Sequence, residues 1–102
     1  MQGEIFGPIL PVISVPSMDA AIDFVTDRPK PLALYLFSND EGTQHKVVDQ
    51  TSSGNVCIND VIMHMVVPEL PFGGVKTSGY GRELSAQGIR AFCNLKTVWV
   101  GA

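Results

Sequence analysis

The sequence predicts an α/β fold with a parallel sheet, and two patterns carry this prediction. Three apolar runs, at residues 9–15, 32–37 and 55–58, alternate with two stretches of helical spacing. Strands joined through helices form parallel pairs, because a right-handed crossover returns the chain to the same end of the sheet. We therefore expect a strand–helix–strand–helix–strand unit, followed by a long loop, a helix and a terminal strand.

The first strand and helix follow from the start of the chain. Residues 9–15 are nearly all apolar and predict a buried strand, although Pro11 indicates an edge or an irregular start. Ser17 is suited to cap a helix at residues 18–26, and Asp19 lies near the positive end of the helix dipole. The expected inner face of this helix is apolar at helical spacing: Met18, Ala21, Ile22 and Val25.

The second strand and helix follow in the same way. Residues 32–37 are continuously apolar, which is typical of a strand covered on both faces. Residues 38–40 supply a turn and a cap for a helix at residues 41–50, with Val47 and Val48 on its inner face. This helix is the expected crossover between the second and third strands.

The second half of the chain is less regular. Residues 59–83 show no clear periodicity, and such a stretch within a compact domain indicates a functional loop or a surface completed by something else. A helix is expected at residues 83–92. Residues 95–100 (Leu-Lys-Thr-Val-Trp-Val) predict a fourth strand, whose partner edge can lie in another subunit.

Composition limits the classes of function. A chain of 102 residues is the size of one domain. Its 17% charged residues fall below the usual share of about 25%, so we expect apolar surface to meet a partner, another copy of the chain or a further part of a larger protein. The net charge of −3 without a Lys/Arg stripe argues against nucleic-acid binding, and no apolar run is long enough to span a membrane.

The cysteines and the N-terminus bear on the compartment. Cys57 and Cys93 form no Cys-x-x-Cys pair, and no basic segment followed by an apolar stretch begins the sequence. We therefore expect two reduced thiols and a cytoplasmic location.

Residues 70–84 form a glycine-rich loop with four of the ten glycines, at positions 73, 74, 79 and 81. Glycine permits φ > 0 and a close approach to the backbone, so the loop is either a structural turn or the wall of a ligand pocket. It does not match the phosphate-binding motifs. Val75 precedes Lys76 where the P-loop has glycine, and Leu84 stands where a dinucleotide fingerprint requires its third glycine.

The histidines and cysteines give weak signals on spacing alone. Asp60 and His64 are four residues apart, but two ligands make a poor metal site, and His45 fits an exposed helix position. His64 lies in the irregular segment, where a pocket-facing role and a structural role both stay open. Cys57 in a buried strand, and Cys93 beside an aromatic residue at a helix end, fit small-hydrophobe packing better than nucleophilic catalysis.

Four motifs occur in one order along the chain: residues 4–8 (Glu-Ile-Phe-Gly-Pro), 29–33 (Pro-Lys-Pro-Leu-Ala), 55–60 (Asn-Val-Cys-Ile-Asn-Asp) and 71–84, from Pro-Phe-Gly-Gly to Gly-Arg-Glu-Leu. Together they resemble the C-terminal part of the NAD(P)-dependent aldehyde dehydrogenase superfamily, over essentially the whole chain. The middle of the chain looks most like the class 3 branch, which acts on fatty and aromatic aldehydes. The end looks more like the succinate-semialdehyde or betaine-aldehyde branches.

The resemblance implies roles for individual residues. Glu4 matches the Glu that hydrogen-bonds the nicotinamide ribose, and Phe6 matches the Phe that packs near the nicotinamide. Phe72 matches the Phe that lines the substrate tunnel near the reactive carbon. Asn59 and His64 fall in the neighbouring tunnel segment. NAD or NADP is the implied cofactor of the intact enzyme, and a small aldehyde is its implied substrate.

The resemblance also implies what lies outside this sequence. In the family, the cysteine nucleophile, the general-base Glu and the dinucleotide-binding domain precede the matched segment, so we expect the isolated chain to be inactive and to bind no cofactor. Glu83 matches a buried Glu that supports the proton-relay region in some members. Residues 1–93 are expected to form the C-terminal fragment of the catalytic domain, and residues 94–102 an oligomerisation strand of a homo-oligomer. The alternative is a non-enzymatic assembly module.

Overall fold

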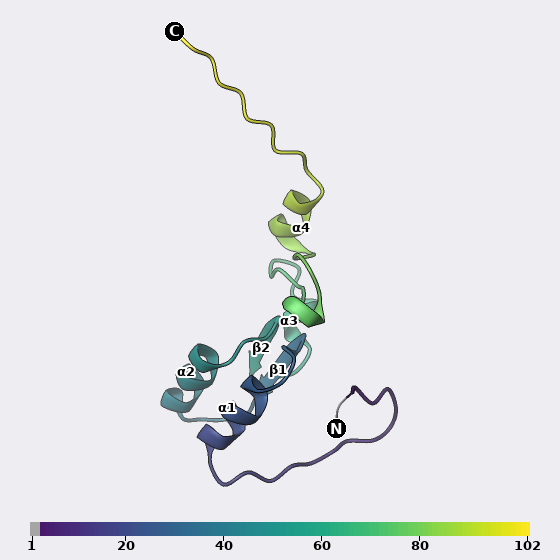
Figure 1. Ribbon diagram of the computed structural model, residues 1–102, viewed down its shortest axis with the longest axis vertical. Helices are drawn as coiled ribbons and strands as arrows, with labels where there is room; N and C mark the ends of the chain where they lie inside the picture. The colour runs from purple at the N-terminus through teal and green to yellow at the C-terminus, as the bar shows by residue number, and fades with distance from the viewer. Residues whose placement is uncertain (1–2) are drawn as a thin grey trace.

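The computed structural model describes residues 3–102. Its elements in chain order are α1 (Met18–Thr26), β1 (Ala33–Leu36), α2 (Glu41–Gln50), β2 (Asn55–Ile58), α3 (Met63–Val66), the 3-10 helix η1 (Lys76–Ser78) and α4 (Ser85–Ala91) (Figure 1). The first four elements lie where the sequence predicts them, and the irregular segment contains only the one-turn elements α3 and η1. None of the helices in this described part is long and apolar enough to cross a membrane.

The two strands form a parallel sheet. Ala33 lies opposite Asn55, and Leu36 lies opposite Ile58. α2 is the crossover that joins them, as a parallel pair requires. Figure 1 shows α1 and α2 beside the strands, with α3 and then α4 further along the long axis of the chain. The predicted α/β class with a parallel sheet is confirmed.

Side-chain caps explain where α1 and α2 begin. Oγ of Ser17 accepts a hydrogen bond from the N–H of Ala20 at 3.2 Å, and Oδ2 of Asp40 accepts one from the N–H of Thr43 at 2.7 Å. These bonds satisfy N–H groups that a first helical turn leaves without partners, so both predicted caps are confirmed. Hydrogen bonds from the side chain and then the backbone of Thr43 hold the pKa of Asp40 below its ordinary value of 3.8.

A small core lies between the two helices and one face of the sheet. Ile22 of α1, Leu36 of β1 and Val47 of α2 are buried, and Leu34 packs against them. Burial stabilises each of these side chains by roughly 1.5–3 kcal/mol. Val48 is 45% exposed, so its predicted place on the inner face is wrong. Successive helical residues are turned by about 100°, and only Val47 faces the core.

The strands predicted at residues 9–15 and 95–100 are not formed. In the described residues the sheet consists of β1 and β2, and both outer segments carry no ladder partner. Their large apolar side chains are between 41% and 89% exposed. The prediction is therefore wrong for the chain by itself, because an apolar run needs the edge of another strand before it can pair.

The last helix begins later than predicted. Leu84 has φ +62°, in the left-handed region, so the helix begins at Ser85 instead of Glu83. Glu83 belongs instead to an isolated antiparallel bridge with Phe72. Glu83 therefore lies in the glycine-rich loop and not in the helix.

The chain is elongated. Its radius of gyration is 17.7 Å and its principal extents are 65 × 34 × 26 Å. A compact domain of this length has a radius of gyration of about 13 Å. Figure 1 shows the residues after α4 running out as a single extended segment. This shape leaves large apolar side chains in contact with solvent at both ends of the chain.

Candidate functional site

The face of the sheet opposite the core carries the candidate site. Tyr35 of β1 and Cys57 of β2 are register partners. Tyr35 lies between the core-packing residues Leu34 and Leu36, so its side chain points to the other face. Asn55 lies two positions before Cys57 and shares that face. The alternation along two short strands thus separates core residues from site residues.

α3 brings His64 to this face. Ile62, immediately before the helix, has φ +66°, a conformation that a β-branched residue rarely adopts. The chain turns there so that α3 packs on β2. His64 is only 9% exposed, and its Nδ1 lies 3.1 Å from Sγ of Cys57. A thiol and an imidazole therefore form a buried hydrogen-bonded pair.

The ring of His64 lies beside two aromatic rings. Its centroid is 5.6 Å from that of Tyr35, with an interplanar angle of 46°, and 5.7 Å from that of Phe72, with an angle of 25°. Both separations are in the range of favourable aromatic pairs. The structure thus brings together two predicted tunnel residues, His64 and Phe72.

The glycine-rich loop places Phe72. Phe72 and Glu83 exchange two backbone hydrogen bonds, of 2.8 and 2.6 Å. The side-chain amide of Asn55 donates to the carbonyls of Leu32 at 3.0 Å and Gly73 at 3.2 Å, which ties the loop to the start of the sheet. These hydrogen bonds hold the loop against the site face, so it is not a flexible linker.

Two glycines permit this close approach. A side chain at Gly54 would overlap the carbonyl oxygen of Gly73, and one at Gly74 would overlap the carbonyl oxygen of Ser78. Only a hydrogen atom fits at either position. The loop is thus a structural turn that supports the ring of Phe72.

Asn59 follows β2 and cross-links the ends of the two strands. Its Oδ1 accepts a hydrogen bond from the N–H of Ser38 at 2.8 Å, and its Nδ2 donates to the carbonyl of Ser38 at 2.9 Å. Both ends of the side-chain amide are therefore used within this chain. A tunnel-lining role for Asn59 stays a prediction.

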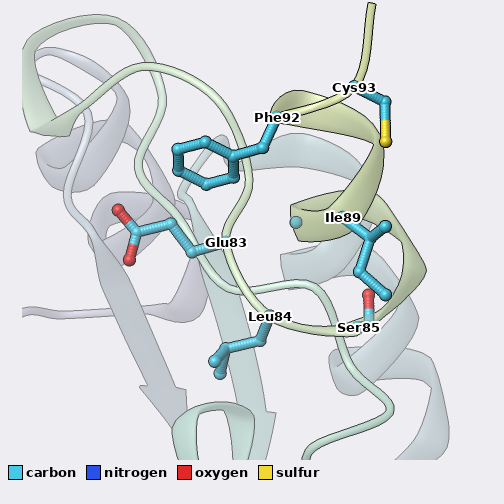
Figure 2. Close-up of a pocket in the computed structure, with 7 residues that line it drawn as sticks. Glu83, Leu84, Ser85, Ile89, Phe92 and Cys93 are labelled. Atoms are coloured by element: carbon cyan, nitrogen blue, oxygen red, sulfur yellow. The ribbon is translucent and has the colours of Figure 1, made fainter.

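Glu83 lies at an open, mostly apolar hollow along α4. The hollow has a volume of about 870 Å³ and is also lined by Leu84, Ile89, Phe92 and Cys93, among others. Figure 2 shows the carboxylate of Glu83 pointing to the left, away from α4, whereas Ile89 and Cys93 lie at the right of the view. The resemblance implies a buried Glu at this position, but Glu83 is exposed in this chain. Its relay role would require cover from other groups and stays a prediction.

Glu4 and Phe6 lie in a different part of the molecule from His64 and Phe72. They line a second hollow of about 1440 Å³, together with residues 27–33 and η1. The ring of Phe6 is 92% exposed. A cofactor-contact role for Glu4 and Phe6 stays a prediction.

The other histidine and cysteine take no part in the contacts of His64 described above. His45 is exposed on α2, as the sequence predicts, and Cys93 is a free, exposed thiol after α4. Asp60 accepts a hydrogen bond from the N–H of Val61 at 2.7 Å. Among residues 3–102, no three His, Cys, Asp or Glu side chains lie close enough to hold a metal ion.

Sequence reasoning missed Tyr35, Asn55 and the Cys57–His64 bond. Strand alternation is the signal for the first two, since positions 35 and 55 share the face opposite the core. The Cys57–His64 bond depends on the left-handed backbone of Ile62, and no glycine marks that turn in the sequence.

Comparisons with known proteins agree with this geometry. The family described as "Aldehyde dehydrogenase family" matches residues 1–98. Aldehyde dehydrogenase family 3 member A2 of Mus musculus is 60% identical over 81 residues, which are 79% of this chain and 17% of that protein. The dimeric NADP-preferring aldehyde dehydrogenase of Rattus norvegicus is 48% identical over 100 residues, which are 98% of this chain and 22% of that protein.

A solved structure supports the same fold. The substrate-bound state of Staphylococcus aureus AldH has a TM-score of 0.88 and 45% sequence identity. The similarity covers 100% of this chain and 23% of that one. The chain spans about a fifth of the length of the relatives that it matches. The chain belongs to the aldehyde dehydrogenase family.

Proposed function

We propose that the chain supplies one wall of the substrate tunnel and a cofactor contact in an NAD(P)-dependent aldehyde dehydrogenase, which oxidises an aldehyde to a carboxylic acid. The family match over residues 1–98 carries this proposal. Residues 1–93 would be the C-terminal fragment of the catalytic domain, and residues 94–102 its oligomerisation strand. The fixed loop that holds Phe72 supports the assignment of a tunnel wall.

Glu4 and Phe6 would hold part of the cofactor. NAD(P) supplies the hydride acceptor when it is bound. The carboxylate of Glu4 would accept hydrogen bonds from ribose hydroxyls, and the exposed ring of Phe6 would pack against the nicotinamide, which fixes its orientation. These two residues are a small part of a dinucleotide site, so the isolated chain is expected to bind no cofactor.

The attacking thiol is proposed to lie outside this chain. Cys57 is buried and directed at His64, and Cys93 is exposed after α4. The chain would therefore complete the tunnel in an enzyme whose nucleophile another segment supplies. A cytoplasmic location stays part of the proposal.

The aldehyde is proposed to be apolar, of the fatty or aromatic class. The 60% identity to a family 3 member favours this branch. The wall also offers the rings of Tyr35 and Phe72 to a substrate in place of a charged side chain. A semialdehyde or betaine aldehyde would need a charged contact from another part of the enzyme.

A chimera tests this proposal. The chain would replace the matching segment of the Rattus norvegicus relative, which already supplies the other four fifths of its length. We expect NAD(P)-dependent oxidation of apolar aldehydes by the chimera, none by the purified chain, and a raised KM in the chimera after Phe72→Ala. A folded but inactive chimera, or an unchanged KM after Phe72→Ala, would contradict the tunnel assignment. Turnover by the chain alone that disappears with Cys57→Ala or Cys93→Ala would contradict the absence of a nucleophile.

The exposed terminal segment favours a second candidate function, assembly. Leu95, Val98 and Trp99 are 83%, 73% and 89% exposed, and such side chains are suited to an added strand at a subunit interface. The word "dimeric" in the name of one relative supports a homo-oligomer. We expect the chain to self-associate at micromolar concentration in sedimentation experiments, and Val98→Lys to reduce this. A stable monomer would contradict the assembly role.

A further inference from the structure

We infer that Cys57 and His64 are positioning residues that fix the ring of Phe72. Cys57 holds the imidazole of His64, and the imidazole in turn holds the ring that faces the substrate. The inference rests on the proposed function of Phe72 as a tunnel wall. It adds a role for two residues that contact neither cofactor nor reacting atoms.

The first step is the bond between Cys57 and His64. Cys57 lies within β2, so strand pairing with Tyr35 fixes its backbone. Its Sγ is 3.1 Å from Nδ1 of His64, inside the range of a sulfur hydrogen bond. If the thiol donates, Nδ1 must carry the lone pair and Nε2 must carry the proton. The bond therefore sets the orientation of the imidazole and, with the thiol as the donor, its tautomer.

The second step is the contact between His64 and Phe72. The two rings are nearly parallel, with an interplanar angle of 25° and centroids 5.7 Å apart. Tyr35 contacts the imidazole at a larger angle of 46°. A ring that is bonded at Nδ1 and flanked by Tyr35 has little freedom to rotate. It therefore presents a fixed surface to Phe72.

The backbone and the imidazole restrain different parts of Phe72. The two hydrogen bonds with Glu83 fix where the backbone of Phe72 lies, but they leave the side-chain torsions free. The stacked imidazole restrains the direction of the ring. Both restraints are needed to give the wall one shape.

The backbone two residues before His64 is strained. Ile62 adopts φ +66° two residues before it, a conformation that is strained for a β-branched side chain. Burying an imidazole also requires a hydrogen-bond partner, whereas a leucine would fill the space without one. A polar ring in this place therefore needs a reason beyond filling volume, and the orientation of Phe72 supplies it.

Nuclear magnetic resonance on the full chain tests the geometry. Long-range ¹H–¹⁵N correlations report which nitrogen of His64 carries the proton, and ring-to-ring contacts report its position against Phe72. We expect the Nε2–H tautomer alone and His64–Phe72 contacts in the wild type, a tautomer mixture and weakened contacts with Cys57→Ala, and recovery with Cys57→Ser, which keeps a donor. Cys93→Ala and His45→Gln are the matched controls and should change neither. A wild-type His64 with the tautomer mixture of a free histidine, or a Cys57→Ala chain with an unchanged Phe72 ring, would overturn the inference.

Kinetics of the chimera separate this inference from the proposed function. With Cys57→Ala or His64→Leu, we expect kcat/KM for a bulky aromatic aldehyde to fall on the order of tenfold, while that for a short aldehyde changes less. Cys57→Ser should restore the ratio between the two substrates. If Phe72→Ala has no effect, the proposed tunnel wall fails. If Phe72→Ala raises KM but the Cys57 and His64 variants behave like Cys93→Ala, the wall stands and the positioning role is overturned.

Discussion

Two regions of this chain share an apolar character and differ in their surroundings. Leu36 in β1 is 8% exposed, whereas Leu10 in the N-terminal segment is 86% exposed. Both belong to runs that predict a buried strand. The difference is that β1 has β2 beside it, and the N-terminal segment has no strand partner within the described residues. An apolar run thus indicates that a segment needs cover, but it does not say which chain provides the cover.

The largest expected effect comes from removing a side chain in each region. Leu36→Ala should lower the free energy of unfolding by about 2–5 kcal/mol, because it leaves a cavity in the core. Leu10→Ala should change it by less than about 0.5 kcal/mol, because the side chain is already in solvent. Urea denaturation of both variants measures the contrast. Equal losses would mean that the N-terminal segment is packed in solution.

The next effect concerns the contact between the loop and the sheet. Gly74→Ala should lower the free energy of unfolding by about 1–3 kcal/mol, because the added methyl overlaps the carbonyl of Ser78. Gly42→Ala in α2 is the matched control, since its methyl would meet only the side chain of Asp40, at an ordinary contact distance of 3.4 Å. We expect the control to gain up to about 1 kcal/mol from helix propensity. A tolerated Gly74→Ala would show that the loop is loose.

A pH-dependent effect on stability should arise at the N-terminus of α2. Hydrogen bonds from Thr43 lower the pKa of Asp40 below 3.8 in the folded chain. The charged cap therefore contributes stability that is complete above 3.8 and is lost as the pH falls through the lower folded value. Asp40→Asn keeps a cap but carries no charge to titrate. The free energy of unfolding, measured by urea denaturation at a series of pH values, should therefore fall less at acidic pH in this variant. If the variant loses as much stability at acidic pH as the wild type, other carboxylates cause the acid unfolding.

The smallest effect is expected at the ion pair between Lys46 of α2 and Asp19 of α1. Their side chains are 38% and 68% exposed. Exposed pairs of this kind contribute about 0.2–1 kcal/mol. A double-mutant cycle with Lys46→Ala and Asp19→Ala should give a coupling in that range, which weakens in high salt. A larger coupling that salt does not reduce would mean that the pair is more enclosed in solution.

The sequence predicted the elements from α1 to β2 correctly because their signals are local. The Ser17 and Asp40 caps and the crossover helix depend on residues within a few positions of one another. The outer strands could not be predicted correctly for this chain, because strand pairing depends on an edge elsewhere. Val48 was misplaced because the inner face of α2 is narrow: Val47 is buried in the core, and the next residue is turned by about 100° toward solvent.

The candidate site was predictable in part. The motif around Phe72 indicated a wall, and the structure places that ring against His64, which the same resemblance put in the tunnel segment. The bond between Cys57 and His64 arises from two left-handed residues, Asn59 and Ile62. Asn59 is a common turn residue, but a β-branched residue such as Ile62 rarely adopts this conformation, so the second turn had no signal in the sequence.

The alternation along the two strands has a consequence for how proteins of this kind can vary. Leu34 and Leu36 of β1 pack in the core with α1 and α2, whereas Tyr35 and Cys57 lie on the opposite face and contact His64. Changes at Leu34 or Leu36 would alter how firmly the two helices and the sheet hold together, and changes at Tyr35 or Cys57 would alter the surroundings of His64. Neighbouring residues of one short strand thus serve two separate parts of the molecule.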